Sequence, residues 1–317
     1  MNNGDFNITA IVVNWYSSTF LKVLFANLRD KAGAPEKIRF LIVDNTNGLD
    51  NSLAELSSSG SSVTIMPNKP ASQHGSRAHA SGLNLALRAV KTEYGLILDP
   101  DTHIFKGDWD DFCVDLLRRN DVIAVGATFP PWQLGKYHNF PNPVFCFFDT
   151  AEFLEMPADW TPYELSPIMK CLHFVKRNIV RCGKLIDRKK YGSSGVARTV
   201  GMRLERIMGV CSADTGYLNA LRAEKQNVGS ITFRAALPDD HAAFADTAAF
   251  KDLASHYELY YYRDEPILTH KYNTAGKHWR TKKGDDVSFW REAIARFEKA
   301  VDDRRQLSAS SVNSGQT

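Results

Sequence analysis

Hydrophobic residues in the first part of the chain follow two patterns that alternate. Five short apolar runs have the length and composition of buried strands. They occupy residues 8–14, 38–43, 63–66, 96–98 and 121–127. Between them, apolar side chains recur at helical spacing, which predicts helices at residues 20–29 and 82–90. This alternation predicts an α/β fold with a mostly parallel central sheet flanked by helices.

The pattern is less regular after residue 130. Helical spacing predicts three more helices, and a short apolar run predicts one late strand. The helices span residues 172–186, 211–225 and 286–301, and the strand spans residues 266–270. Residues 306–317 are rich in Ser, Asn, Gly and Gln, so we expect a disordered tail there.

Polar side chains stand at or just after the predicted strands. Asp99 and Asp101 follow the fourth strand, while Asn14, Asp44 and Asn68 end or follow the first three. Side chains at i and i+2 of an extended chain point the same way, so the two aspartates offer their carboxylates to one point. Such oxygens suit Mg²⁺ or Mn²⁺ carrying a diphosphate. A solvated Asp-Pro turn is the alternative for the triplet alone, but ligands of parallel sheets bind at this edge, which favours a site.

Composition excludes several other classes of protein. The 317 residues are 44% hydrophobic and 24% charged with a net charge of +3, so nucleic acid is not an expected partner. The five cysteines include no C-x-x-C pair, which argues against a zinc site or disulfide framework and for a reducing compartment. No signal-peptide pattern and no apolar run of membrane-spanning length occurs. We therefore expect a cytoplasmic protein, either free or at the inner face of the membrane.

One segment departs from this even balance of charge. Residues 170–206 contain 11 Lys and Arg against 2 Asp and Glu. A solvated face or an interdomain helix is the ordinary interpretation. The sharper alternative is a surface that receives a phosphorylated acceptor or makes peripheral contact with an anionic membrane.

Four pieces of the first half, in order, resemble the family 2 glycosyltransferases, which are inverting enzymes with the GT-A fold. Residues 11–15 resemble the family's opening strand, and residues 41–46 resemble its second strand. Asn68 and the glycines after it resemble the Asn/Gly-rich segment that precedes the metal motif, and residues 98–102 resemble that motif. The likeness is interrupted at residues 69–79, where two histidines stand in place of a shorter Gly/Ala-rich run.

The resemblance implies that residues 1–130 bind a nucleotide-sugar donor together with Mn²⁺ or Mg²⁺. The donor-binding residues it implies are Val13, Asn14, Asp44, Asn45, Asn68, Gly75, Arg77, Asn84 and Asp99. The implied metal ligands are Asp101, Asp99 and His270, the last resembling a late-strand histidine that closes over the metal in many GT-A enzymes. His74 and His79 flank Arg77 in a predicted polar loop, where they contact the diphosphate or are simply solvated.

In the second half, residues 212–222 resemble the acidic helix start that holds the family's catalytic base. The matching position is Asp214, which could also act as a helix N-cap. One carboxylate base with no protein nucleophile implies inversion of the anomeric configuration. Residues 131–305 would then be the acceptor-binding and catalytic half of the same domain, and the acceptor a glycan or a lipid-linked glycan.

Two other functions fit the same pattern less well. A nucleotidyltransferase that makes nucleotide sugars shares the sheet and the metal carboxylates. That class usually carries a Gly-rich, basic loop after the first strand, and residues 15–20 contain no such loop. A non-catalytic nucleotide- or glycan-binding module is the second alternative, and the Asp99/Asp101 pair together with Asp214 argues against it.

Overall fold

The computed structural model describes residues 7–313 except 59–61, 73–74, 165, 173, 176–187, 211–213, 241–246 and 272–285. Its first half is the predicted parallel sheet, in the strand order β3-β2-β1-β4. These strands are β1 (Ile8–Asn14), β2 (Ile38–Asp44), β3 (Val63–Pro67) and β4 (Tyr94–Leu98). Their predicted positions are confirmed to within a few residues.

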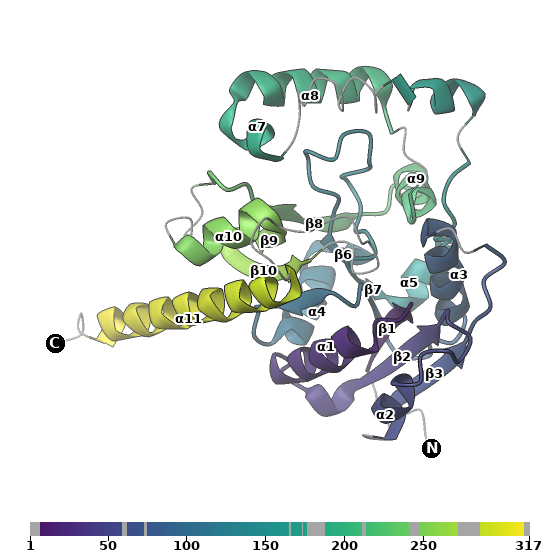
Figure 1. Cartoon of the computed structure of the whole chain (residues 1–317), viewed down its shortest axis with the longest axis horizontal. Coiled ribbons are helices and arrows are strands. Elements are labelled where there is room, and N and C mark those ends of the chain that lie inside the picture. The colour runs from purple at the N-terminus through teal and green to yellow at the C-terminus, as the bar shows by residue number, and fades with distance from the viewer. Residues whose placement is uncertain are drawn as a thin grey trace.

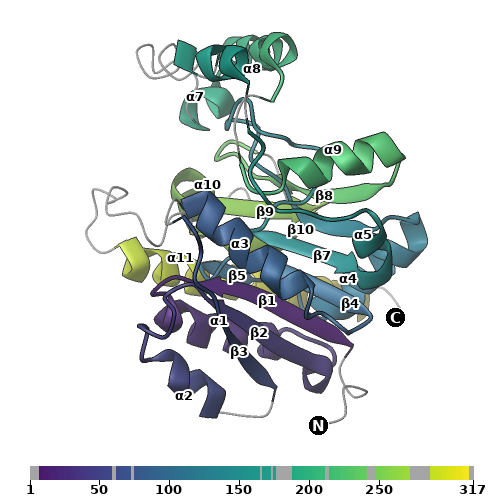
Figure 2. The ribbon, with the colours of Figure 1, turned by 90° about the vertical axis from the view of Figure 1, so that its right-hand side faces the viewer.

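Alternate residues of β1 face two separate parts of the core, as the period of two in a strand requires. Ala10 and Val12 pack with α1 (Ser18–Asp30) on one side of the sheet. Ile11 and Val13 pack with α3 (Gly75–Leu87) on the other side. The sheet is therefore covered on both faces, as predicted (Figure 2). Strands β1, β2 and β4 are buried, whereas the edge strand β3 is partly exposed.

The second half continues the same sheet, largely with antiparallel strands. After β4 the order is β7-β6-β8-β9-β10-β5, which makes ten strands among the described residues. Their bounds are β5 (Thr102–Ile104), β6 (Ala124–Ala127), β7 (Phe145–Asp149), β8 (Ser230–Ala235), β9 (Glu258–Tyr262) and β10 (Glu265–His270). The predicted strand at residues 121–127 exists as β6, but it lies beside β7 and β8 rather than beside β4.

Helices surround this sheet (Figure 1). The remaining ones are η2 (Pro35–Lys37), α2 (Leu53–Ser58), α4 (Trp109–Asn120), α5 (Thr150–Glu155), α7 (Arg188–Ser193), α8 (Gly195–Met208), α9 (Tyr217–Gln226), α10 (Ala248–His256) and α11 (Asp286–Asn313). Helices α7 and α8 stand away from the sheet at the top of the molecule (Figures 1 and 2). None of the helices described is both long enough and apolar enough to cross a membrane.

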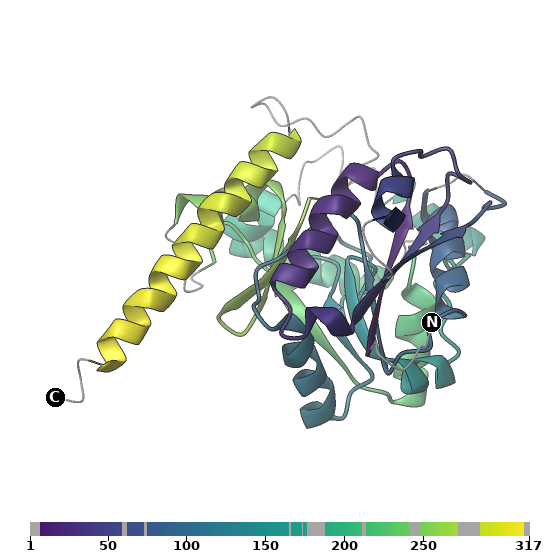
Figure 3. The same cartoon turned by 90° about the horizontal axis from the view of Figure 1, so that it is seen from below.

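Several predicted helix boundaries are corrected. Helix α3 begins at Gly75 rather than at residue 82, so the predicted polar loop around Arg77 and His79 is helical. The helix predicted at 211–225 is α9, which starts only at Tyr217. Helix α11 continues to Asn313 instead of ending at residue 301, into the segment expected to be a tail, and its far end projects from the body (Figure 3). Most of the helix predicted at 172–186, and His74, lie outside the described residues.

Candidate functional site

Strand register brings a histidine to the two aspartates. Asp101 is followed directly by the short strand β5, which pairs antiparallel with β10. The register places His270, the last residue of β10, opposite Thr102. The backbone N–H of Lys271 donates to the carbonyl of Asp101 at 2.9 Å and fixes this junction. His270 therefore lies beside the Asp99/Asp101 pair although it is far away in sequence.

These three side chains form a compact group of metal-ligating atoms. His270 Nε2 lies 3.5 Å from Asp99 Oδ2 and 3.3 Å from Asp101 Oδ1. One ligand atom from each residue lies within 4.8 Å of the others. Asp101 Oδ2 is buried and has no hydrogen-bond partner among the described residues. A buried, unsatisfied carboxylate oxygen is costly, and two carboxylates with an imidazole suit Mn²⁺ or Mg²⁺, so the residues fit a divalent cation.

Glu258 contacts the nitrogen of His270 that faces away from the two aspartates, and this residue was not predicted from the sequence. It faces His270 across β9 and β10, and its Oε2 lies 2.9 Å from His270 Nδ1. Tyr260 donates its hydroxyl to the same oxygen and Gln133 donates to Oε1. These partners assign the proton to Nδ1 and turn Nε2 toward the aspartates, as in carboxylate–histidine–metal arrangements. The sequence signal was a lone acidic residue opening an otherwise apolar strand.

Negative charge accumulates around this group. Burial raises the pKa of Asp99, and Asp101 and Glu258 raise it further, against the lowering effect of His79 and His270. Burial alone would lower the pKa of His270, but Asp101 and Glu258 outweigh it, so that pKa lies well above its usual value. The cluster is therefore an environment that gains from a cation.

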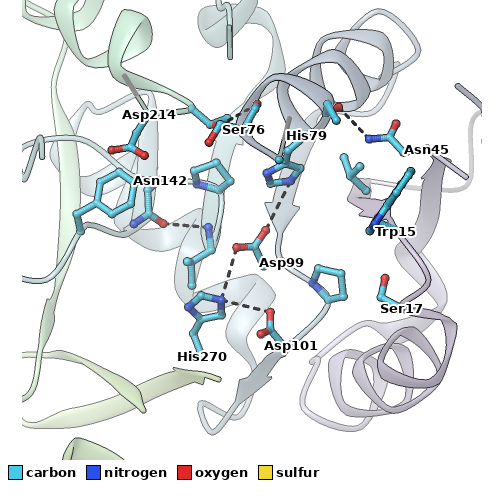
Figure 4. Close-up of a pocket in the computed structure, with 18 of the residues that line it drawn as sticks. Trp15, Ser17, Asn45, Ser76, His79, Asp99, Asp101, Asn142, Asp214 and His270 are labelled. Atoms are coloured by element: carbon cyan, nitrogen blue, oxygen red, sulfur yellow. Dashed lines mark hydrogen bonds and ion pairs between the residues drawn. The ribbon is translucent and has the colours of Figure 1, made fainter. Parts of the chain in front are cut away.

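A pocket of about 500 Å³ surrounds the cluster. Figure 4 shows Trp15 and Asn45 at one end of the pocket, Asp214 and Asn142 at the other, and Asp99 between the two ends. The lining residues include the predicted donor contacts Val13, Asn45, Gly75 and Asp99, together with Asp101, His270 and Asp214. The pocket thus joins three chemically different regions: an aromatic and amide end, the metal-ligating cluster, and a carboxylate end.

Asn14 and Asp44 lie behind the pocket rather than in its wall. Asn14 donates to Asp44 Oδ1 at 3.1 Å and accepts from the N–H and hydroxyl of Ser17. Burial alone would raise the pKa of Asp44, but hydrogen bonds from Thr46, Gly48 and Asn14 outweigh it, and the pKa lies below its usual value. This network shapes the turn after β1. Trp15, which the sequence analysis did not predict as a site residue, lies in this turn, lines the pocket and is 40% exposed.

Asn45 and Asn68 tie β2 to α3. Asn68 Nδ2 donates to Asn45 Oδ1 at 2.7 Å, and Asn45 Nδ2 donates to the carbonyl of Ala78 at 2.8 Å. The first residues of α3, including Gly75 and His79, consequently line the pocket. His79 Nε2 lies 3.6 Å from Asp99 Oδ1. A helix N-terminus with a histidine beside it favours an anion at this point.

Arg77 and Asn84 do not line the pocket. Arg77 pairs with Glu164 at the surface, where its side chain is 57% exposed. Asn84 donates to Asp159 Oδ1 at 2.8 Å and accepts from the N–H of Trp160, so it anchors the chain after α5. Their contact with a donor stays a prediction.

Asp214 precedes α9 and faces the pocket opposite Asn45. The N-cap residue of α9 is Gly216, so the alternative role of Asp214 as a helix cap is wrong. Lys136 Nζ lies 2.7 Å from Asp214 Oδ2. The amide Nδ2 of Asn142, which also lines the pocket, is buried without a hydrogen-bond partner among the described residues. This end therefore combines an oriented carboxylate with an amide donor that a ligand could satisfy.

Comparison with known proteins gives structural likeness only. No protein-family model and no curated protein sequence matches the chain. Two solved structures that it resembles are glycosyltransferases. One is the mannosyltransferase PcManGT from Pyrobaculum calidifontis in complex with GDP-Man and Mn²⁺, at 17% identity and a TM-score of 0.45, covering 71% of this chain and 54% of that one. The other is S. aureus TarS in complex with UDP-GlcNAc, at 11% identity and a TM-score of 0.38, covering 49% and 48%.

The chain thus spans about half the length of the solved structures it matches. At TM-scores this low, the likeness carries no argument about what this chain does. The function proposed below rests on the geometry of the pocket.

Proposed function

We propose that the protein is a glycosyltransferase that moves a sugar from a nucleotide-sugar donor to a hydroxyl group of an acceptor. The observation that carries this proposal is the placement of Asp99, Asp101 and His270. Their metal-ligating atoms lie midway along one pocket, between Trp15 and Asp214. A nucleotide sugar needs this sequence of environments: a base-binding end, a cation site for the diphosphate, and a reacting end.

The donor's nucleotide occupies the end of the pocket formed by β1 and β2. Trp15, which lines this end and is 40% exposed, would stack against the base. Asn45 and Val13 line the same end, held by Asn14, Asp44 and Asn68 behind them. The diphosphate then reaches the N-terminus of α3 beside His79, where backbone N–H groups favour negative charge.

Asp99, Asp101 and His270 would hold Mn²⁺ or Mg²⁺. When bound, the ion neutralises the charge that develops on the departing diphosphate. The chain's own contribution is to orient its ligands. The buried hydrogen bond between Glu258 and His270 Nδ1 fixes the ring so that Nε2 faces the two carboxylates.

Asp214 is the proposed general base. The acceptor hydroxyl attacks C1 of the donor sugar, and the bond from C1 to the diphosphate oxygen breaks, leaving its electron pair on the diphosphate. The hydroxyl proton passes to Asp214, whose carboxylate is oriented by Lys136. A single displacement of this kind inverts the configuration at C1. The proposed acceptor is a glycan or a lipid-linked glycan.

A thermal-shift panel of nucleoside diphosphates and nucleotide sugars tests donor binding directly. We expect one nucleotide family to raise the melting temperature with Mn²⁺, because a ligand that binds the folded state stabilises it. The same compounds should give little or no shift in EDTA. If no compound in the panel shifts the melting temperature with Mn²⁺, the proposed donor site is wrong.

Glu258→Gln should weaken Mn²⁺ binding by roughly 10- to 100-fold, the usual cost of losing an outer hydrogen-bond acceptor of a metal ligand. The glutamine keeps the shape of the side chain but loses the charge that orients His270. Mn²⁺ titration followed by electron paramagnetic resonance measures the effect. Glu265→Gln is the matched control, because the side chain of Glu265 is 53% exposed and, among the described residues, its ion pair is with Lys106. Equal Mn²⁺ affinity in the two variants would contradict the positioning role of Glu258.

A further inference from the structure

We propose that the outward face of helix α8 is a docking surface for an anionic lipid bilayer. Val196, Val200 and Ile207 on this helix are 75%, 43% and 81% exposed. Together with Arg203, they follow the spacing i, i+4, i+7 and i+11 (residues 196, 200, 203 and 207), which forms one stripe along an α-helix. We call these four residues the α8 stripe. It presents apolar side chains to solvent over the whole length of the helix.

The α8 stripe is not the face that attaches the helix to the body. That attachment uses the next side of the helix, where Leu204 packs with Tyr191, Leu134 and Leu237 and Gly201 is buried. The apolar arc of α8 is thus wider than the part that the described residues cover. A surface helix normally turns polar residues outward, so an uncovered apolar stripe indicates contact with something other than water.

The charged residues of α8 indicate what kind of partner contacts the α8 stripe. Arg203 and Arg206 are exposed, and neither has an ion-pair partner in the part of the chain that the structure describes. The only acidic residue of α8, Glu205, turns inward, where it accepts from the N–H of Gly135 at 2.9 Å and lies 3.0 Å from His138 Nε2. The outward face is therefore apolar and purely cationic. That combination complements anionic lipid headgroups and repels a second copy of itself.

A second exposed apolar segment lies at the same end of the molecule. Residues 167–172 are helical. Ile168 lies in this helical turn and is 74% exposed, and Phe174, which follows it, is 68% exposed. Figures 1 and 2 show this teal turn near α8, on the side away from the sheet. Two apolar elements at one end of the molecule give the surface more than one point of insertion.

The docking surface is joined to the pocket by one loop. Glu205 on the inner side of α8 binds residues 135 and 138, and between them Lys136 reaches Asp214 in the pocket. Helix α8 and this loop would thus lie between the bilayer and the carboxylate end of the pocket, where the proposed reaction takes its acceptor. Lipid docking itself needs neither donor nor acceptor, so it can be tested independently of the proposed reaction.

Co-sedimentation of the full chain with vesicles tests the proposal. We expect binding to vesicles that contain phosphatidylglycerol and little binding to pure phosphatidylcholine. Arg203→Glu/Arg206→Glu should lower the ratio of bound to free protein by at least about tenfold, because each basic side chain near an anionic surface adds to binding. Arg118→Glu/Arg119→Glu makes the same change in charge on α4, where both side chains are exposed, and should lower binding less.

The apolar part of the stripe is tested separately with Val200→Ser/Ile207→Ser. This variant should also release the protein from anionic vesicles, whereas Val23→Ser/Leu154→Ser, at positions that are 44% and 43% exposed on α1 and α5, should not. Wild-type binding without preference for phosphatidylglycerol would overturn the proposal, as would equal losses in the two charge-reversal variants. Self-association in gel filtration that Val200→Ser/Ile207→Ser abolishes would also overturn it, since the partner would then be a second copy of the chain.

Discussion

Asp101→Asn is expected to lower metal-dependent turnover of the donor by about 10³-fold or more, because a Lewis-acid cation contributes several kcal/mol and each 1.4 kcal/mol is about tenfold in rate. Asp101 supplies a buried carboxylate oxygen with no hydrogen-bond partner in the described structure, so the asparagine keeps the shape and removes the charge. Release of nucleoside diphosphate from the donor in Mn²⁺ measures the loss.

The fold should survive this substitution. It removes the attraction between Asp101 and His270, but it also relieves the repulsion between Asp101 and Asp99, and Glu258 keeps its hydrogen bond to His270. Circular dichroism and a cooperative melting transition in EDTA would confirm this. Asp115→Asn is the matched control, because Asp115 is exposed on α4 and its ion pair within the described part of the chain is with Arg119. Full Mn²⁺-dependent turnover by Asp101→Asn would show that the cation lies elsewhere.

Asp214→Asn is expected to lower kcat for transfer by about 10²–10⁴-fold, the usual contribution of a general base. Binding of the donor should persist, because Asp214 lies at the opposite end of the pocket from Trp15 and Asn45 (Figure 4). The two effects separate when transfer is measured at saturating donor and the donor-induced thermal shift is measured in Mn²⁺.

A second substitution separates the base from its ion pair. Lys136→Met removes the 2.7 Å contact to Asp214 but leaves the carboxylate, so it should cost less activity than Asp214→Asn. Transfer by Asp214→Asn at the wild-type rate would contradict the role of Asp214 as the base. Loss of the donor-induced thermal shift in that variant would instead place Asp214 in the donor site.

The parts of the site that the sequence predicted are local ones. Asp99 and Asp101 lie two residues apart after a buried strand, as predicted. The extended chain assumed for them is wrong, because residues 100 and 101 form a turn between β4 and β5, and this turn brings the two carboxylates together. His270 was placed by resemblance, and the register of β5 and β10 supplies the physical reason. Glu258 was missed because its partner is opposite on another strand, and Lys136 because it lies in a loop without a periodic pattern.

The same distinction holds for the fold. Strands β1, β2 and β4 were predicted because buried parallel strands are continuous apolar runs separated by helices. Strand β3 is partly exposed but is also a short apolar run. Strand β5 is only three residues long, and β8 is half-exposed, so neither gives a clear pattern. Strand β7 is apolar, but it inserts antiparallel between β4 and β6. That order depends on pairing between distant segments, which periodicity within a segment does not encode.

Turnover of nucleotide sugars tests the central claim most directly. The full chain would be incubated with the donor that the thermal-shift panel selects, in Mn²⁺ or in EDTA, and the products identified by mass spectrometry. The proposed function predicts sustained release of nucleoside diphosphate in Mn²⁺ and little in EDTA, with turnover by Asp101→Asn in Mn²⁺ lower by about 10³-fold or more. Binding of the donor without any turnover would instead indicate a binding module. In a parallel incubation with a sugar phosphate and a nucleoside triphosphate, formation of a nucleotide sugar would indicate a nucleotidyltransferase. Either result would contradict the proposed transfer reaction.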